Sequence, residues 1–346
     1  MKIVVLHNEP AEHAAVDDSD VLVQRDAVIE ALHSMGYETD CLDCNLDLET
    51  ARVQLLKRKP DVVFNLVESL GGTDRLMAMA PMLLEAMEIP FTGAGSDALI
   101  ASSNKLVAKR RLRSAGVPTP AWYLPEDSPL QKGGTGFFGS RQFLDFSKIE
   151  RWIIKPILEH ASLGMDDDAV VQVADVVMLE SLIRQREGAV GRPHFAEQFI
   201  EGREFNLSVL AGRVLPAAEI VFVDFPENKP HIVGHLAKWA PDSFEYQKTP
   251  RRFDFPTTDR LLLQKLARLS RRCWALFELD GYARVDFRVD ENGQPWILEI
   301  NSNPCLSPDA GFAAALHNAG IPFFNAIDQV INAALSGDRV LVTSRR

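Results

Sequence analysis

Apolar runs and amphipathic stretches alternate through the first hundred residues of the chain. Short runs bounded by turn signals indicate strands, and the segments predicted as strands are KIVVL, YETDCLD and PDVVFNLV. Between and after them, apolar side chains recur at helical spacing over residues 19–35 and 75–89. Ser19 is the predicted N-cap of the first helix and Gly36 its stop. This alternation of strands and helices predicts an open α/β sheet.

The rest of the chain has longer polar segments between its predicted elements. A helix over 104–115 leads into GVPTP, whose prolines indicate a boundary. Residues 125–140 are rich in glycine, proline and serine and predict a mobile loop, and 224–256 form a second polar segment. Further strands are predicted at WIIKPI and on either side of a Glu-Gly turn in HFAEQFIEGREFNLSVLAG, and further helices at 258–277 and 322–335.

Residues 284–304, RVDFRVDENGQPWILEINSNP, place carboxylates and an amide where strands usually carry apolar side chains. Period-2 alternation puts Asp286 on the face opposite Val285 and Phe287. In the second run, it puts Trp296, Leu298 and Ile300 on one face and Ile297, Glu299 and Asn301 on the other. Because ENG predicts a hairpin turn between the two runs, Asp286 is expected to face the same way as Glu299 and Asn301.

Three converging oxygen-bearing side chains suit a hard cation. Mg²⁺ is bound in proteins by a few carboxylates together with phosphate oxygens, so Asp286, Glu299 and Asn301 are candidate ligands. The alternative is a solvated sheet face with incidental charges. It accounts poorly for the rigid SNPC turn that follows directly and would close such a site.

Composition and charge narrow the class of protein. A chain of 346 residues with 46% hydrophobic and 25% charged residues is ordinary for a globular protein with two or three lobes. The net charge of −11, without a basic tract, argues against a nucleic-acid partner. No apolar run approaches the roughly 20 residues of a membrane span, and the N-terminus is interpreted as a strand rather than a signal peptide. We therefore expect a cytoplasmic protein.

Two local motifs are interpreted as structural. The four cysteines do not form a disulfide framework for a chain of this size, and CLDC at 41–44 has no second pair that would complete a zinc site. Gly134, Gly136 and Gly139 match the dinucleotide fingerprint, but a polar segment precedes them instead of a strand. A lid or linker is the favoured interpretation, and a dehydrogenase would rest on this match alone.

Motifs along most of the chain resemble the D-alanine:D-alanine ligase family of ATP-grasp enzymes. The matching segments, in order, are PDVVFNLVESLGG, FTGAGSDALIASSNK, GVPTP, WIIKP, EQFIEGREF, LAKW, GYARVDF and LEINSNP. The resemblance implies an α/β ATP-grasp fold, with an open α/β N-terminal domain over 1–103 and two α+β lobes, 104–201 and 202–338, that clamp ATP. It also implies a homodimer formed through the N-terminal domain.

The resemblance assigns expected roles to matching residues. Lys105, Lys155, Lys238 and Ser162 match phosphate-contacting residues; Glu197, Gln198, Phe199 and Ile200 match the adenine-binding strand; and Glu204 matches the ribose-binding acid. Asp286, Glu299 and Asn301 match the ligands of Mg²⁺ or Mn²⁺, and Arg284 matches the arginine that stabilises an oxyanion. A lysine that directly follows the apolar residues of WII is costly to bury without an anionic partner, which independently supports Lys155.

The implied reaction is ATP-dependent amide bond formation. A substrate carboxylate attacks the γ-phosphate, and an amine then attacks the resulting acylphosphate to give an amide, ADP and phosphate.

The amino-acid side of the site departs from the family pattern. Its glutamate loop is absent, with only Glu9 or Glu12 as substitutes, and its serine and tyrosine positions hold Ala161 and Trp239. Glu68 stands at a histidine position, Pro304-Cys305 replaces a Pro-Gly turn, and Ala310 replaces a serine that grips the second carboxylate. We therefore expect an altered ligase of amino acids or small peptides. Its candidate substrate-binding residues are Glu68, Ser307 and Asp309, although helix capping accounts equally well for Asp309.

Other functions remain open from the sequence. One is a true D-alanine:D-alanine ligase of cell-wall synthesis, and another is an ATP-grasp kinase or carboxylase-like enzyme. A third is a nucleotide-binding module without turnover, although such a module would not need Arg284 beside a complete set of metal ligands.

Overall fold

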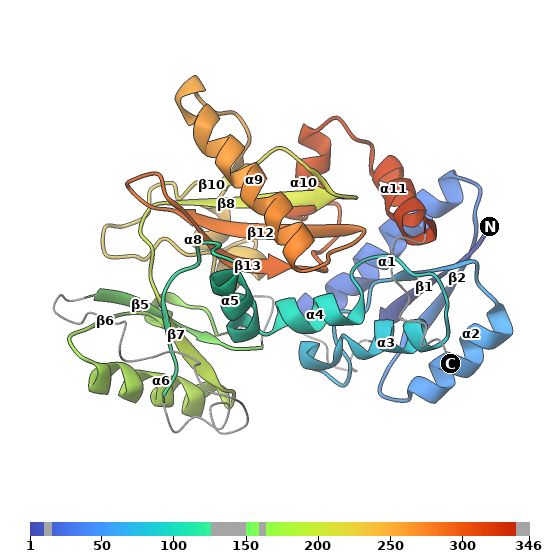
Figure 1. Ribbon diagram of the computed structural model, residues 1–346, viewed down its shortest axis with the longest axis horizontal. Helices are drawn as coiled ribbons and strands as arrows, with labels where there is room; N and C mark the ends of the chain where they lie inside the picture. The colour runs from blue at the N-terminus through green and yellow to red at the C-terminus, as the bar shows by residue number, and fades with distance from the viewer. Residues whose placement is uncertain (10–15, 126–149, 159–163, 337–346) are drawn as a thin grey trace.

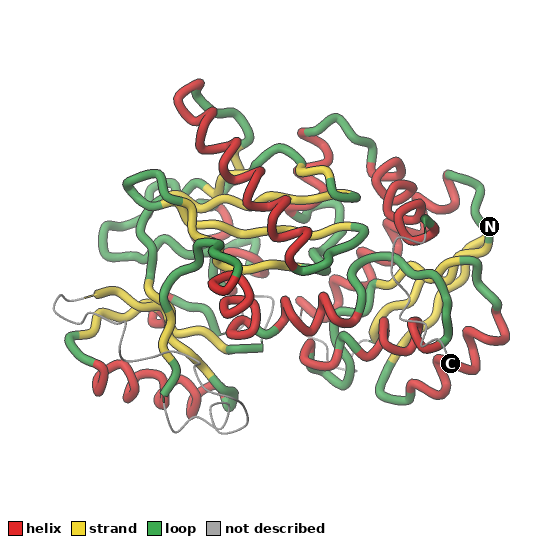
Figure 2. The backbone as a smooth tube through the Cα atoms, in the orientation of Figure 1, coloured by secondary structure: helices red, strands yellow, loops and turns green. Residues whose placement is uncertain are grey.

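The computed structural model describes residues 1–9, 16–125, 150–158 and 164–336. Within these residues the strands form three sheets that follow one another along the chain (Figures 1 and 2). The first has the order β2-β1-β3, the second β4-β7-β5-β6, and the third β11-β10-β8-β12-β13 with β9 beside β8. The predicted loop at 125–140, apart from Pro125, and the glycine motif within it lie outside the described residues.

The first sheet confirms the predicted open α/β arrangement. Its central strand β1 pairs in parallel with both β2 and β3. The elements are β1 (Lys2–Asn8), α1 (Val16–Ser34), β2 (Glu38–Cys44), α2 (Leu48–Arg58), β3 (Val62–Asn65), η1 (Asp74–Leu76) and α3 (Met79–Ala86). Helix α1 begins at Val16, so the prediction that Ser19 is its N-cap is wrong. It ends before Gly36, as predicted, where a φ of 77° favours glycine.

The second sheet is preceded by two short helices instead of one. The elements are α4 (Ser96–Ser103), α5 (Lys105–Ser114), β4 (Trp122–Tyr123), β5 (Glu150–Pro156), η3 (Asp167–Ala169), β6 (Val170–Val173), α6 (Val176–Val190) and β7 (His194–Gln198). Asn104 has an extended backbone, and its side chain accepts hydrogen bonds from the N–H groups of Leu106 and Val107. It therefore caps α5 and separates it from α4, which sequence periodicity did not reveal.

The third sheet contains the hairpin of residues 284–304. The elements are β8 (Arg203–Leu210), β9 (Arg213–Val214), β10 (Ala218–Ile220), α7 (His235–Trp239), α8 (Phe244–Gln247), β11 (Arg251–Arg252), η4 (Thr257–Asp259), α9 (Arg260–Leu276), β12 (Tyr282–Val289), β13 (Pro295–Asn301), α10 (Gly311–Asn318) and α11 (Phe323–Leu335). The strands on either side of the Glu-Gly turn belong to different sheets. Gly202 has a φ of 130°, and a Cβ there would overlap the carbonyl oxygen of Val289, so this crossing between sheets requires glycine.

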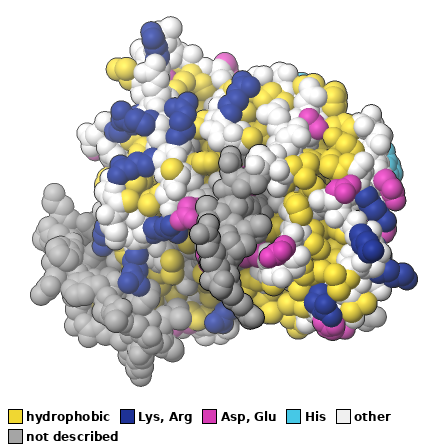
Figure 3. Space-filling view, turned by 45° about the vertical axis from the view of Figure 1, so that its right-hand side comes forward, with side chains coloured by type: hydrophobic (Ala, Val, Ile, Leu, Met, Phe, Trp, Pro, Cys, Tyr) yellow, Lys and Arg dark blue, Asp and Glu magenta, His cyan; other side chains and the backbone are white. Residues whose placement is uncertain are grey.

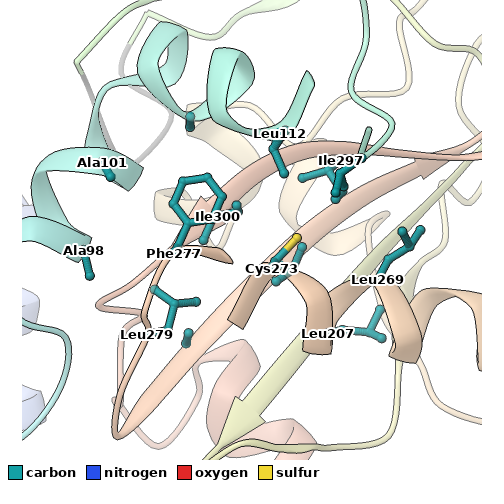
Figure 4. Close-up of a cluster of buried hydrophobic side chains, with 14 of the residues drawn as sticks. Ala98, Ala101, Leu112, Leu207, Leu269, Cys273, Phe277, Leu279, Ile297 and Ile300 are labelled. Carbon is teal, nitrogen blue, oxygen red and sulfur yellow. The ribbon is translucent and has the colours of Figure 1, made fainter. Parts of the chain in front are cut away.

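Two buried clusters hold the sheets and helices together. In the first, α4, α5 and α9 pack on one face of the third sheet; Figure 4 shows Ala98, Leu112 and Cys273 directed into this cluster. In the second, residues of α10 and α11 share a cluster with residues of α1, β1 and β3, and α11 contacts α1 and β3 directly. Helix α11 thus returns to the first sheet, and the predicted domain boundaries stay predictions.

The surface charge is unevenly distributed, and the cysteines are unpaired as expected. Lys and Arg side chains gather at the upper left of Figure 3, over the part of the surface that α9 forms, although the net charge is −11. All four cysteines are free thiols, as expected. None of the helices in the described ranges combines the length and apolar character needed to cross a membrane.

Candidate active site

Polar side chains from three adjacent strands meet on the face of the third sheet opposite α9. Strand β12 lies between β8 and β13 (Figure 1), and Asp286 is paired with Asn206 on one side and Glu299 on the other. Arg284, two residues earlier, is paired with Asn301. The predicted hairpin is therefore confirmed, and β8 adds Asn206, whose Nδ2 donates to Asp286 Oδ1 at 2.9 Å.

A β-bulge changes which residues of β13 face this site. The register shifts between Asp286 and Phe287, so that Phe287 is paired with Ile297 and Leu298 is the extra residue. Ile297 is fully buried in the core, whereas Leu298 lines the same cavity as Glu299. The predicted faces of Ile297 and Leu298 are thus wrong, because strict alternation does not anticipate a bulge.

Arg284 and Asp286 form a bidentate ion pair. Arg284 Nε and Nη2 donate to the two carboxylate oxygens of Asp286 at 2.7 and 2.9 Å. Burial acts to lower the pKa of Arg284, but the carboxylates of Asp286 and then Glu299 raise it well above its usual value. The guanidinium is therefore charged, held in one orientation and directed into the cavity, as an oxyanion-binding group requires.

The donor set fits a divalent cation that also binds phosphate oxygens. Nowhere in the described ranges do three His, Cys, Asp or Glu side chains come together as a metal-binding cluster. Asp286, Glu299 and the Asn301 amide nevertheless line one cavity. Because Mg²⁺ commonly takes only one or two carboxylates and completes its shell with phosphate and water, this smaller set is compatible with it.

One cavity of about 890 Å³ joins this face to the other two sheets. Its volume falls within the range usual for small-molecule sites. The cavity is lined by most of the predicted site residues: Glu68, Lys105, Lys155, Glu197, Gln198, Phe199, Ile200, Glu204, Lys238, Arg284, Asp286, Glu299, Asn301 and Asp309. Burial lowers the pKa of both Lys105 and Lys238, and the Glu299 carboxylate acts in the opposite direction on each.

A buried carboxylate lies between two lysines at the edge of the cavity. Lys155 Nζ donates to Glu197 Oε1 at 2.7 Å, and Lys109 contacts Glu197 Oε2. Burial alone would raise the pKa of Glu197, but the two ammonium groups hold it below its usual value. Burial lowers the pKa of Lys109 to about 8, against the attraction of Glu197. The side chain of Glu197 therefore positions lysines in this structure.

Glu204 is buried beside an arginine. Arg288 Nη2 lies 3.1 Å from Glu204 Oε2, and the same guanidinium donates to the carbonyl oxygens of Gly202 and His231. Burial raises the pKa of Glu204, and the charge of Arg288 opposes that rise. Arg288 thus fixes the orientation of the predicted ribose-binding acid.

An acidic group of residues lies at the end of the cavity nearest the first sheet. Asp20 accepts hydrogen bonds from Ser307 Oγ at 2.6 Å and from the Cys305 thiol at 2.9 Å. Gln24 Nε2 donates to Glu68 Oε1 at 2.9 Å and to Asp20 Oδ2 at 3.3 Å. Burial, Glu68 and Asp20 all raise the pKa of Cys305, so its sulfur stays a thiol and is unsuited to act as a nucleophile.

Several predicted residues are placed elsewhere. Ser307 is buried and bonded to Asp20, and it does not belong to the cavity lining. Glu9 is exposed and accepts a hydrogen bond from Asn45. Ser162, together with Ala161 and Glu12, lies outside the described residues.

Several residues of this site were not singled out from the sequence, among them Lys109, Asp20, Gln24, Asn206 and Arg251. Lys109 lies four positions after Lys105 on α5, and Gln24 four positions after Asp20 on α1. Residues at this spacing share a helix face, so Lys105 could have pointed to Lys109, whereas both Asp20 and Gln24 were missed.

Known proteins resemble the chain over nearly its full length. The family model described as D-ala D-ala ligase C-terminus matches residues 152–332. The D-alanine–D-alanine ligase of Methylococcus capsulatus is 31% identical, over 90% of this chain and 89% of the relative. That of Gloeobacter violaceus is 28% identical, over 97% of this chain and all of the relative.

A solved structure gives the same fold. The D-alanine–D-alanine ligase of Bacillus anthracis complexed with ATP superposes with a TM-score of 0.69 at 20% identity, covering 97% of this chain and 98% of that one. The expected ATP-grasp fold is thereby confirmed. The chain therefore belongs to the D-alanine–D-alanine ligase family, and it is an ADP-forming carboxylate–amine ligase.

Proposed function

We propose that the chain joins the carboxylate of one amino acid to the amine of a second with consumption of ATP, and that D-alanine serves on both sides. The observation that carries this proposal is the convergence of Arg284, Asp286 and Glu299 with three lysines on one cavity. Similarity to D-alanine–D-alanine ligases over 90% of the chain or more supports D-alanine as the first substrate to test.

ATP is proposed to lie between the second and third sheets. Lys105, Lys155 and Lys238 supply positive charge for its phosphates, and Glu204 accepts hydrogen bonds from its ribose. The N–H groups of Gln198 and Phe199 already donate to backbone oxygens of the protein. We therefore assign adenine recognition to the backbone at Ile200, which also lines the cavity.

The reacting groups are proposed to meet beside Arg284. The donor carboxylate attacks the γ-phosphate, and the amine then attacks the acylphosphate, so that negative charge develops on the former carboxylate oxygen. Arg284 faces this charge with a fixed guanidinium. Mg²⁺ or Mn²⁺, held by Asp286, Glu299 and Asn301, would offset the charge of the phosphates. Glu68 and Asp20 place two carboxylates in the cavity lining, where they could bind a substrate ammonium group.

A second candidate is a ligase with an altered amino-acid pair. Specific observations favour it: Trp239 lines the cavity where the family pattern has a tyrosine, and Ala310, also in the lining, offers no hydroxyl. Glu68, which stands where the family pattern has a histidine, also lines the cavity. These differences all lie on the amino-acid side, so both candidates share the same ATP chemistry. A homodimer stays a prediction under either.

One assay separates these candidates. ADP release is measured with Mg²⁺ and D-alanine, then with pairs of D- and L-amino acids and dipeptides, and products are weighed by mass spectrometry. Release with D-alanine alone, with a product one water lighter than two D-alanines, supports the main proposal. Release only with another pair supports the altered site. ATP binding without ADP release under every pair would contradict both.

Glu204→Gln is expected to weaken ATP binding by about tenfold. The neutral amide replaces a charged acceptor for the ribose hydroxyl groups, and hydrogen bonds to charged groups are worth roughly 1.5–3 kcal/mol. Isothermal titration calorimetry with ATP measures the change, and 2′,3′-dideoxy-ATP should bind both proteins equally. If the variant discriminates between the two nucleotides as strongly as the wild type, Glu204 does not contact the ribose.

A further inference from the structure

Arg251 projects into the cavity from the edge strand β11. This strand pairs antiparallel with β10, with Arg251 opposite Ile220, and both residues line the cavity. Consecutive residues of a strand face opposite sides, and Arg252 accordingly contacts the buried carboxylate of Glu219, which also pairs with Arg203. Arg251 and Arg252 are thus the same residue type, but one side chain faces the cavity and the other faces Glu219.

The guanidinium of Arg251 lies against the start of α10. Its Nη1 donates to the carbonyl oxygen of Asp309 at 3.3 Å, and its Nε lies 3.4 Å from the place where a Cβ on Gly311 would be. Ala310, the N-cap of α10, makes no side-chain hydrogen bond. Both Ala310 and Gly311 line the cavity beside Arg251. A cationic side chain and the N-terminal end of a helix therefore share one end of the cavity.

This end of the cavity favours a bound anion. Within the described part of the chain, no carboxylate oxygen lies within 4 Å of the Arg251 guanidinium. Arg251 keeps part of its surface exposed; desolvation and then the nearby charge of Arg284 lower its pKa, and Tyr246 and Asp309 act in the opposite direction. Asp286 already pairs with Arg284, so Arg251 is the guanidinium of the two for which a bound anion would supply a partner.

We propose that Arg251 binds the carboxylate of the amine-bearing substrate and restricts the acceptor to amines that carry one. The inference rests on the proposed ligase function and holds for either amino-acid pair. The ATP phosphates are assigned to the three lysines, and the donor carboxylate is consumed by the reaction beside Asp286 and Glu299. The acceptor carboxylate is the substrate anion not yet assigned a partner. A guanidinium recognises a planar carboxylate by two parallel hydrogen bonds, which a neutral amide does not accept equally well.

The test compares an acceptor amino acid with its primary amide. With the donor and acceptor identified by the assay above, the wild type is expected to prefer the amino acid over its amide by about 100-fold in kcat/KM. Arg251→Met keeps the side-chain length without the charge and should raise the acceptor KM by about 100-fold, so that this preference disappears. The KM for ATP should stay within about twofold, because Arg251 is not assigned to the nucleotide.

Arg252→Lys is the matched control, because Arg252 neighbours Arg251 in the same strand and faces the ion cluster around Glu219. It should keep the preference for the amino acid. Arg251→Lys retains the charge without the planar guanidinium, so it should show part of the preference for the amino acid over its amide. It replaces Arg251→Met in the test if that variant does not fold. A full preference in a folded Arg251→Met enzyme overturns the inference while leaving the ligase function intact. A wild type inactive with every pair overturns the ligase function itself.

Discussion

Glu299→Gln is expected to lower kcat by about 1,000-fold while ATP still binds. The substitution keeps the shape of the side chain and removes one of the two carboxylates proposed to hold the metal. Metal-ion stabilisation of a transferring phosphoryl group is worth several kcal/mol, and each 1.36 kcal/mol in the barrier is about tenfold in rate. The Glu299 carboxylate also raises the pKa of Arg284, and it opposes the lowering of the Lys105 pKa by burial. Its loss therefore removes a negative charge that stabilises the charged forms of both side chains.

The measurement separates turnover from nucleotide binding. Without Mg²⁺, ATP should bind the variant at least as tightly as the wild type, because a negative charge near the phosphates has been removed. Adding Mg²⁺ should then improve binding far less than it does in the wild type. Glu291→Gln is the matched control, since Glu291 is exposed in the turn of the same hairpin. A Glu299→Gln kcat within tenfold of the wild type would show that this carboxylate is not a metal ligand.

The sequence predicts the parts of the site that depend on local periodicity. Asp286, Glu299 and Asn301 lie in a short hairpin, where alternation and a turn signal suffice to place them on one face. The orientation of Ile297 could not be predicted in this way. Its orientation depends on a bulge, which inserts a residue into one strand according to cross-strand packing that periodicity does not encode.

Contacts between distant segments account for the other differences. Asp20 and Cys305 are separated by 285 positions, yet their side chains are bonded, and no local pattern links them. The β7 and β8 strands follow one another but enter different sheets, because the crossing at Gly202 is set by its close approach to Val289. The family resemblance supplied the expected roles of Lys105 and Lys238, which local patterns alone would leave as ordinary lysines.

Charged side chains lie at both ends of the cavity, and carboxylates occur at each end. Glu68 and Asp20 lie near the first sheet, whereas Arg284 and Arg251 lie towards the third, with Cys305 exposed to the field of both groups. An amino-acid pair has a free ammonium on its donor and a free carboxylate on its acceptor. Under the proposed function, Glu68 and Asp20 would face the donor ammonium and Arg251 the acceptor carboxylate.

Glu197→Gln is expected to lower the free energy of unfolding by about 3–5 kcal/mol at neutral pH, the usual loss when one partner of a buried ion pair is removed. The Glu197 carboxylate is 1% exposed and lies between Lys109 and Lys155. Lys109 is further held by Thr119, to whose hydroxyl its Nζ donates at 2.8 Å. A neutral amide in place of the carboxylate would leave two ammonium groups close together without their shared anion. Urea unfolding followed by fluorescence or circular dichroism measures the change.

The pH dependence and a double variant test whether charge is the cause. The folded protein lowers the pKa of Glu197 below its usual 4.5, so its contribution is present above pH 4.5 and is lost as pH falls through the folded-state pKa. The difference between wild type and Glu197→Gln should shrink accordingly in acid. Combining Glu197→Gln with Lys109→Met should cost less than the sum of the single changes, because the second substitution removes a cation that the first leaves uncompensated. Glu201→Gln, which breaks an ion pair with Arg151 at the surface, should change stability far less. Additive effects in the double variant would mean that Lys109 and Glu197 stabilise the protein independently.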